Sequence, residues 1–347
     1  MSRATRTARP TWPVVAAVIL AAVGLAGCAR TAVIHPYVVT GQPSLSIDAP
    51  LENVACTAAG SCLAVGVDDA GPTPVAAGEL RQGGGRWTPL VVPNAPQQTI
   101  TASACWTSQC LIAGSTSSGD SLWTYDPKSL SVSVSPAPHG GRGVSAVSCF
   151  APGSCAVVDS TGVAGDSRIS FSDDGGTTWS TPLSMQWTTD TAVTALACYD
   201  GFDCLAAATN ARSHVLLEVT HDRGLTWSPL AVPSTWTTLT SLTCVQSHCV
   251  ALASTSATSL VVRTGSFFRE WKDLALADDA SSLACATLTH CVVVGHTPSR
   301  GPWLATLKGV HVTNITLKYV PAALVDVACG AKVCTAIGDA TVMALRP

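Results

Sequence analysis

The chain has 347 residues, of which 47% are hydrophobic and only 12% are charged. A disordered chain would have high charge and few apolar residues, so this composition excludes one. A nucleic-acid-binding domain would show a basic excess, whereas here 19 Lys and Arg face 22 Asp and Glu. The length suits two average domains or one large all-β domain. The 15 cysteines are an odd number, which indicates one cysteine with a separate role.

That separate cysteine lies in a predicted export signal. Three arginines precede an apolar run over residues 14–25, which is about half the length that a membrane-spanning helix needs. A basic start, a short apolar run and small residues at its end are typical of a secretory signal. The next residues, Leu25-Ala26-Gly27-Cys28, resemble the lipobox of bacterial lipoproteins. This resemblance implies cleavage after residue 27 and lipidation of Cys28; the alternative is an ordinary cleaved signal with an incidental cysteine.

The predicted signal sets the location of the rest of the chain. We expect residues 1–27 to be a signal peptide, residues 28–43 a lipidated N-terminus and linker, and residues 44–347 a folded domain. No other stretch is apolar and long enough to span a membrane. The sequence therefore predicts a lipoprotein held on the extracytoplasmic face of the cell membrane. Disulfides persist in such an oxidising compartment.

The other fourteen cysteines fall into close pairs that repeat along the chain. The first members of successive pairs are 41 to 49 residues apart, and a period in the low to middle forties suits a four-stranded propeller blade. Each pair separates two short apolar runs, which predicts a β-hairpin. The predicted pairs are Cys56 and Cys62, Cys105 and Cys110, Cys149 and Cys155, Cys198 and Cys204, Cys244 and Cys249, Cys285 and Cys291, and Cys329 and Cys334.

These pairs favour disulfides over zinc sites. The two ends of so short a loop are close enough for disulfide geometry. Zinc sites favour two intervening residues and four converging ligands. His248 and His290 each adjoin a cysteine, but seven similar half-sites in an exported chain argue against a metal. We therefore expect one hairpin disulfide per unit, with no metal and no cofactor.

Two units carry a further motif, Ser/Thr-x-Asp-x-Gly-x-Thr-Trp. It resembles the Asp-box, or BNR repeat, of sialidase-like propellers, in which the box joins the third and fourth strands of a blade. In such a turn the aspartate accepts backbone hydrogen bonds, the glycine relieves a tight backbone and the tryptophan packs under the blade. We expect this structural role for Ser172, Asp174, Gly176, Trp179, Thr220, Asp222, Gly224 and Trp227.

Together these patterns predict an all-β fold, a seven-bladed propeller with four-stranded blades and one disulfide hairpin per blade. After Cys334 only thirteen residues remain, too few for three further strands. We expect residues 44–47 to supply the outer strand of the last blade and so to close the ring. Closure of this kind removes exposed sheet edges.

Two polar residues interrupt the small side chains of the predicted inner strands. Asn53 and Asp326 each lie three residues before a first cysteine, where the other units have Ala or Ser. Blades one and seven are neighbours in a closed ring, so we expect the two side chains near each other at the axis. Either they bind a ligand in the channel, or they satisfy buried backbone groups and hold channel water.

The cysteine turns also carry aromatic residues, which we expect to cluster around one end of the ring. They are Trp106, Phe150, Tyr199 and Phe202. Two interpretations stand: a contact surface for a partner, or packing between adjacent loops.

The resemblance to sialidase-like propellers raises the question of catalysis. Sialidases use a tyrosine paired with a glutamate, an aspartate acid/base and three arginines; the predicted inner strands here contain no arginine. We therefore transfer no catalytic residue. The sequence favours a monomeric, non-catalytic binding or scaffold module for an envelope protein or glycan, without a nucleic-acid partner. The alternatives are a sialidase-like glycoside hydrolase with unrecognised or degenerate residues, and an extracytoplasmic assembly factor, because Asp-box propellers also resemble photosystem II assembly factors.

Overall fold

The computed structural model describes stretches that all lie in the second of two compact units, His35–Pro347. These are residues 51–66, 76–80, 99–116, 119–138, 143–160, 166–185, 187, 191–210, 212, 214–245, 247–264, 271–276, 279–297, 301–308, 311–317, 323–331, 333–338 and 341–345. The predicted signal peptide, Cys28, the linker and the predicted closing strand lie outside them. Within these stretches no helix is long and apolar enough to cross a membrane.

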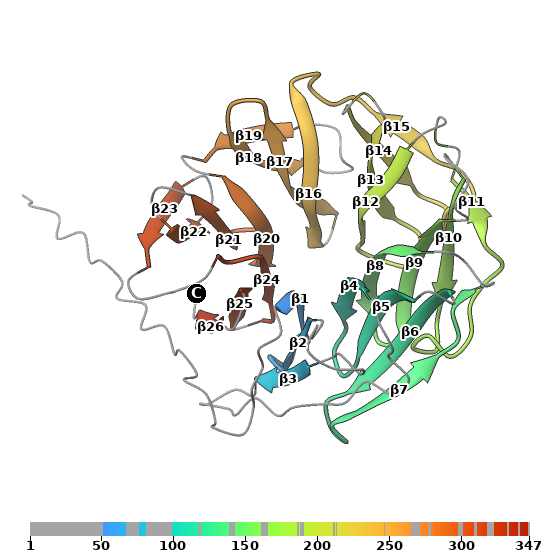
Figure 1. Cartoon of the computed structure of the whole chain (residues 1–347). Coiled ribbons are helices and arrows are strands. Elements are labelled where there is room, and N and C mark those ends of the chain that lie inside the picture. The colour runs from blue at the N-terminus through green and yellow to red at the C-terminus, as the bar shows by residue number, and fades with distance from the viewer. Residues whose placement is uncertain are drawn as a thin grey trace, which may run out of the picture. The chain divides into compact units, whose positions relative to one another are not determined.

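The described strands form seven antiparallel sheets, called sheets 1 to 7 in chain order (Figure 1). In each sheet, strands adjacent in sequence pair with one another. Sheet 1 contains β1 (Leu51–Cys56), β2 (Cys62–Gly66) and β3 (Ala76–Leu80). Sheet 2 contains β4 (Thr99–Cys105), β5 (Cys110–Thr116), β6 (Gly119–Asp126) and β7 (Ser131–Ser135). Sheet 3 contains β8 (Val144–Ala151), β9 (Ser154–Ser160), β10 (Ser167–Ser172) and β11 (Leu183–Ser184).

The second half of the chain repeats this arrangement. Sheet 4 contains β12 (Thr191–Cys198), β13 (Cys204–Asn210), β14 (Val215–Thr220) and β15 (Ser228–Leu230). Sheet 5 contains β16 (Trp236–Val245), β17 (His248–Thr255), β18 (Ser259–Thr264) and β19 (Trp271–Ala275). Sheet 6 contains β20 (Ala280–Thr287), β21 (His290–Thr297), β22 (Gly301–Lys308) and β23 (His311–Thr316). Sheet 7 contains β24 (Asp326–Cys329), β25 (Cys334–Gly338) and β26 (Thr341–Leu345).

The number of complete blades differs from the prediction. Sheets 2 to 6 are four-stranded blades, whereas sheets 1 and 7 have three strands among the described residues. The prediction of seven four-stranded blades is therefore too high, and the structure shows five. Residues 81–98, which follow β3, and residues 44–47, predicted to complete the last blade, lie outside the described stretches. Ring closure by an N-terminal strand stays a prediction.

Each sheet begins with a disulfide-bonded hairpin, as predicted. The two cysteines of every pair lie directly opposite each other in the register of the first two strands. Their Cα atoms are 3.9 to 4.1 Å apart, and all seven pairs are bonded. Because each bond closes a loop of about seven residues, it contributes about 2 kcal/mol in the chain-entropy model. The disulfide therefore stabilises one hairpin and joins no two sheets.

A β-bulge recurs at one place in the first strand of sheets 1 to 6. The register shifts between the residues five and three positions before the first cysteine, so the residue four before it has no partner in the second strand. A bulge bends the strand and redirects the side chain of the extra residue. The bulge residues are Glu52, Thr101, Ser145, Thr194, Thr240 and Ser281.

The hydrophobic core lies between neighbouring sheets. The second strands are the most apolar: residues 204–208 of β13 are at most 1% exposed. Separate clusters of buried side chains fill the contacts between sheets 1 and 2, 2 and 3, 3 and 4, 4 and 5, and 5 and 6. A further cluster joins the two ends of the described chain, because Ile337 of sheet 7 packs with Leu51 and Val54 of sheet 1. Each fully buried aliphatic side chain contributes about 1.5 to 3 kcal/mol to folding.

Candidate functional site

The first strands of all seven sheets line a single cavity of about 350 Å³, the central cavity. Its wall is formed by residues 53–56, 101–105, 145–147, 194–196, 240–243, 282–285 and 326–329. These residues are mostly Ala, Ser, Thr and Cys, and their small side chains leave the space open. Both predicted channel residues, Asn53 and Asp326, belong to the wall. Among the described residues that line the cavity, Asp326 has the only ionisable side chain.

The Asp326 carboxylate holds three sheets together. Its Oδ2 accepts a hydrogen bond from the backbone N–H of Val54 in sheet 1, at 2.8 Å. Its Oδ1 accepts one hydrogen bond from the Ser282 hydroxyl of sheet 6, at 2.6 Å, and another from the backbone N–H of the next residue, Val327, at 2.9 Å. Burial raises the pKa of the Asp326 carboxyl to about 6, although these hydrogen bonds act in the opposite direction. The bonds support the structural interpretation of Asp326.

The hydrogen bonds continue through serines at the same repeat position. Ser241 and Ser282 each lie three residues before a first cysteine, as Asp326 does. Their hydroxyl oxygens are 3.3 Å apart. Ser241 also accepts a hydrogen bond of 3.1 Å from the backbone N–H of Leu283 in the next sheet. A chain of polar contacts therefore runs along the cavity wall from sheet 5 to sheet 1.

The bulge hydroxyls form a second set of contacts between sheets, and sequence reasoning missed it. Thr101 donates to the Val144 carbonyl at 2.5 Å. Thr194 donates to the Leu239 carbonyl at 3.2 Å. Ser281 donates to the carbonyl of Leu324, which lies five residues before Cys329, at 2.7 Å. The signal was present in the sequence: five of seven units have Ser or Thr four residues before the first cysteine. Only the bulge shows why that hydroxyl reaches the next sheet.

The two turns predicted as Asp-boxes join the third and fourth strands of sheets 3 and 4, and they share one hydrogen-bond pattern. In the first, Asp174 accepts bonds from Ser172, from the Thr178 backbone N–H at 2.8 Å and from the Thr178 hydroxyl at 2.6 Å. In the second, Asp222 accepts the same bonds at the same distances from Thr226. The threonine hydroxyl and amide hold the pKa of each aspartate below its usual range. Both carboxylates are thereby used within their own turns.

The tryptophans of these turns differ in their hydrogen bonding. The Trp179 indole N–H donates to the Pro136 carbonyl at the end of sheet 2, at 2.8 Å. Trp227 packs on the cluster between sheets 3 and 4, and its buried indole nitrogen has no hydrogen-bond partner. Both side chains thus pack on the apolar cluster between their own sheet and the preceding one, and Trp179 adds a hydrogen bond to that contact.

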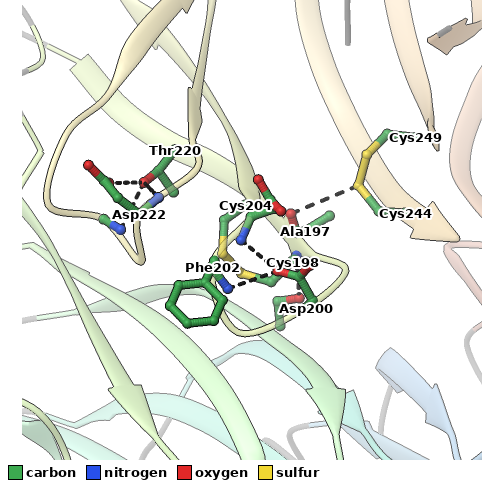
Figure 2. The surroundings of a disulfide bond; sticks show 12 residues. Ala197, Cys198, Asp200, Phe202, Cys204, Thr220, Asp222, Cys244 and Cys249 are labelled. Atoms are coloured by element: carbon green, nitrogen blue, oxygen red, sulfur yellow. Dashed lines mark hydrogen bonds between the residues drawn. A yellow bond between two sulfur atoms is a disulfide. The ribbon is translucent and has the colours of Figure 1, made fainter. Parts of the chain in front are cut away.

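The Cys198–Cys204 turn of sheet 4 lies near the Asp222 turn (Figure 2). Tyr199, Asp203 and His221 form a polar cluster between the two turns. Tyr199 donates to the Asp203 carboxylate at 2.6 Å, and the same carboxylate contacts His221 Nδ1. Burial raises the pKa of Tyr199, and its hydrogen bond to Asp203 adds to the shift. Burial also acts on Asp203, but the bonds from Tyr199 and His221 outweigh it and lower the pKa of Asp203. The cluster fixes the two turns to each other.

Arg223 extends this cluster toward sheet 3. Its guanidinium donates to the Asp173 carboxylate at 2.5 Å and lies 5.1 Å from the centre of the Phe171 ring. Its backbone N–H donates to the Phe202 carbonyl at 2.9 Å. The neighbouring Asp200 carboxylate accepts from the Phe202 backbone N–H at 2.8 Å (Figure 2). The backbone that carries Phe202 is therefore held on both sides.

The predicted turn aromatics have different environments. Trp106 is 5% exposed, and its ring lies beside Gly175 of the next sheet. Phe150 is half-buried and lies near Gly201, also in the next sheet. Phe202, in contrast, is 62% exposed. Packing between adjacent loops therefore accounts for Trp106 and Phe150, while Phe202 faces solvent.

Leu225 is a second exposed apolar side chain on the same two turns, at 70%. We call Asp173, Asp200, Phe202, Arg223 and Leu225 the rim surface. It combines two exposed apolar groups with charges of both signs. No group of three His, Cys, Asp or Glu side chains suited to a metal ion occurs in the described part of the chain.

Comparison with known proteins identifies the fold alone. No protein-family model and no curated protein matches the chain. Among solved structures, YCF48 bound to a D1 peptide is similar over 87% of this chain and 93% of its own, with a TM-score of 0.63 and 13% identity. YCF48 from Cyanidioschyzon merolae gives the same TM-score at 11% identity, over 87% and 97% of the two chains. Virginiamycin B lyase from Staphylococcus aureus gives 0.61 at 8% identity, over 86% and 94%. These likenesses confirm the predicted β-propeller fold.

Proposed function

We propose that this chain is an exported, lipid-anchored propeller that binds a protein segment of the cell envelope without catalysing a reaction. The lipobox-like residues 25–28 support the export and the anchor. The seven disulfides support an oxidising compartment, where such bonds persist. The two Asp-box-like turns support a BNR-type propeller as the scaffold.

The observation that carries the binding proposal is the rim surface. Phe202 and Leu225 expose large apolar side chains beside the charges of Asp173, Asp200 and Arg223. Apolar anchors surrounded by polar groups are typical of protein-binding surfaces. YCF48, which has a similar fold, is bound to a D1 peptide in one solved structure. A protein ligand suits this surface better than a glycan because its two most exposed large side chains, Phe202 and Leu225, are apolar.

The rim surface is also held in place before any ligand binds. The Cys198–Cys204 disulfide closes the turn that carries Phe202, and the bonds of Asp200 and Arg223 fix its backbone. A preorganised surface loses little conformational freedom on binding, which raises affinity. Loops on a rigid scaffold commonly carry binding functions.

Site-specific photo-crosslinking in the native envelope tests this proposal. A photoreactive amino acid is placed at Leu225 in the full-length, lipidated chain, and at Val134 as the matched control, since Val134 is 55% exposed on sheet 2. We expect one partner peptide to be cross-linked from position 225 and not from 134, and Phe202→Ser to reduce its yield at least tenfold. Equal yields from both positions, or an unchanged yield in Phe202→Ser, would contradict binding at the rim surface.

A further inference from the structure

We propose that Asp326 forms a proton-controlled latch between the first and last sheets, which is tighter when its carboxyl is protonated. This inference does not depend on the proposed binding function. It starts from the way neighbouring first strands are joined elsewhere in the chain.

Hydroxyl groups make the corresponding contacts at other junctions. At the junctions between sheets 2 and 3 and between sheets 4 and 5, a bulge hydroxyl donates to a backbone carbonyl of the next first strand. At the junction between sheets 6 and 7, the acceptor is the carbonyl of Leu324, two residues before β24. At the junction between sheets 5 and 6, the Ser241 hydroxyl accepts the Leu283 backbone N–H. A hydroxyl carries no charge at any ordinary pH, so these junctions are insensitive to protons.

The junction between sheets 7 and 1 is built differently. The residue four before the last pair is Val325, which has no hydroxyl to donate. The backbone N–H of Val54, the counterpart of Leu283, is instead bonded to the Asp326 carboxylate. Asp326 thus replaces the serine of the other junction with a group that titrates. Ser282 of sheet 6 donates to the same carboxylate. The charge state of Asp326 therefore affects the contacts among sheets 6, 7 and 1.

No cation in the described surroundings compensates this carboxylate. Of the strands packed against β24, β20 and β25 carry no ionisable side chain, β1 carries Glu52, and β21 carries His290 and His296 at its ends. None of these groups lines the central cavity. In these surroundings, the hydrogen bonds from Ser282, Val54 and Val327 favour the ionised form of Asp326, while burial opposes it.

The direction of the pH effect follows from this balance. An Asp carboxyl in an unfolded segment titrates near pH 4, whereas the pKa of Asp326 in the folded chain is about 6. Between these values the folded junction holds a proton that the opened junction releases. The junction is therefore most stable below about pH 4, and it loses this stabilisation as the pH rises through about 6.

Amide hydrogen exchange at Val54 reads the latch directly. In the mature chain, we expect the protection of Val54, corrected for intrinsic exchange, to fall by up to about 100-fold between pH 4 and pH 7. Leu283 is the internal control, because its N–H is held by a serine. Its protection stays constant over the same range. A flat profile for Val54, or an equal fall for Leu283, overturns the proposal.

Two substitutions exchange the chemistry of the junctions. Asp326→Ser copies the Ser241 arrangement and removes the pH dependence at Val54, while Ser241→Asp confers it on Leu283. Asp326→Asn keeps the size of the side chain and one acceptor oxygen, and it too gives a flat profile. A pH dependence that persists at Val54 in Asp326→Ser or Asp326→Asn overturns the assignment to this carboxyl. If a variant does not fold, the comparison of Val54 with Leu283 in the unmodified chain still decides.

Discussion

The indole N–H of Trp179 donates a hydrogen bond to the backbone carbonyl of Pro136, 2.8 Å away in the preceding sheet. The repeat gives this contact a matched control, because the equivalent Trp227 has a buried indole nitrogen without a partner. We expect Trp179→Phe to lower the free energy of unfolding by about 1 kcal/mol more than Trp227→Phe, since only the first loses a hydrogen bond. Chemical denaturation measures both. Equal losses would contradict a role for the bond.

Acid should weaken the two Asp-box-like turns, in contrast to its effect at Asp326. The pKa of Asp174 and of Asp222 is lowered by bonds from Thr178 and Thr226. A lowered pKa means that stability is present above the normal value near 3.8 and is lost as the pH falls below it. We expect the melting temperature to fall between pH 4 and pH 2, and less steeply in the Asp174→Asn, Asp222→Asn double variant. An identical slope in both proteins would contradict this.

A side chain at Gly224 is expected to destabilise the fold through both backbone strain and crowding. Its φ is +83°, and a Cβ would lie 3.0 Å from the Ile169 methyl carbon of the preceding sheet. Gly301 has a similar φ of +74°, but a Cβ there meets nothing within 4 Å. Gly301→Ala should therefore cost only backbone strain, about 1 to 2 kcal/mol. Gly224→Ala should lower the free energy of unfolding by about 1 kcal/mol more than Gly301→Ala, because the Ile169 side chain must move to make room.

That difference between the two alanine variants, measured by thermal unfolding, separates crowding from strain. Variants of equal stability would show that Ile169 moves aside without cost. The result bears on the whole fold, since Gly176 approaches Ser135 and Leu111 of the sheet before it in the same way.

The proposed lipid anchor is tested apart from the propeller. Cys28→Ser should abolish incorporation of labelled palmitate and release the chain from the membrane fraction, because the lipobox-like segment would have no acceptor thiol. The seven hairpin disulfides are complete without this residue, so the melting temperature of the released chain should be unchanged. Labelling that persists in Cys28→Ser would contradict the lipoprotein assignment.

Much of the fold could be predicted because the residues that define each hairpin and turn are close together in sequence. Each cysteine pair is five or six residues apart, so hairpin and disulfide follow from a single short window. The Asp-box-like turns are local too, and both occur between the predicted strands. Sheets 1 and 7 have three strands among the described residues instead of the expected four, and both residues 81–98 and residues 44–47 lie outside the described stretches.

The sites were less predictable, because they depend on contacts between sheets. Asn53 and Asp326 were placed at one cavity by their repeat position, but the three donors on Asp326 come from three sheets. Trp106 and Phe202 occupy similar turns in the sequence. Only the neighbouring sheet decides that the first is covered, at Gly175, and the second exposed.

Because every disulfide lies within one hairpin, none of them ties the chain across the segments that connect sheets. A protease that cuts once between two sheets would therefore leave two fragments with no covalent link, even without a reductant. Their cohesion would then depend on the apolar contacts and hydrogen bonds between neighbouring sheets. Separation of the nicked fragments in non-reducing detergent would show that no disulfide joins them. Their co-elution in native buffer would show that the contacts between sheets hold them together.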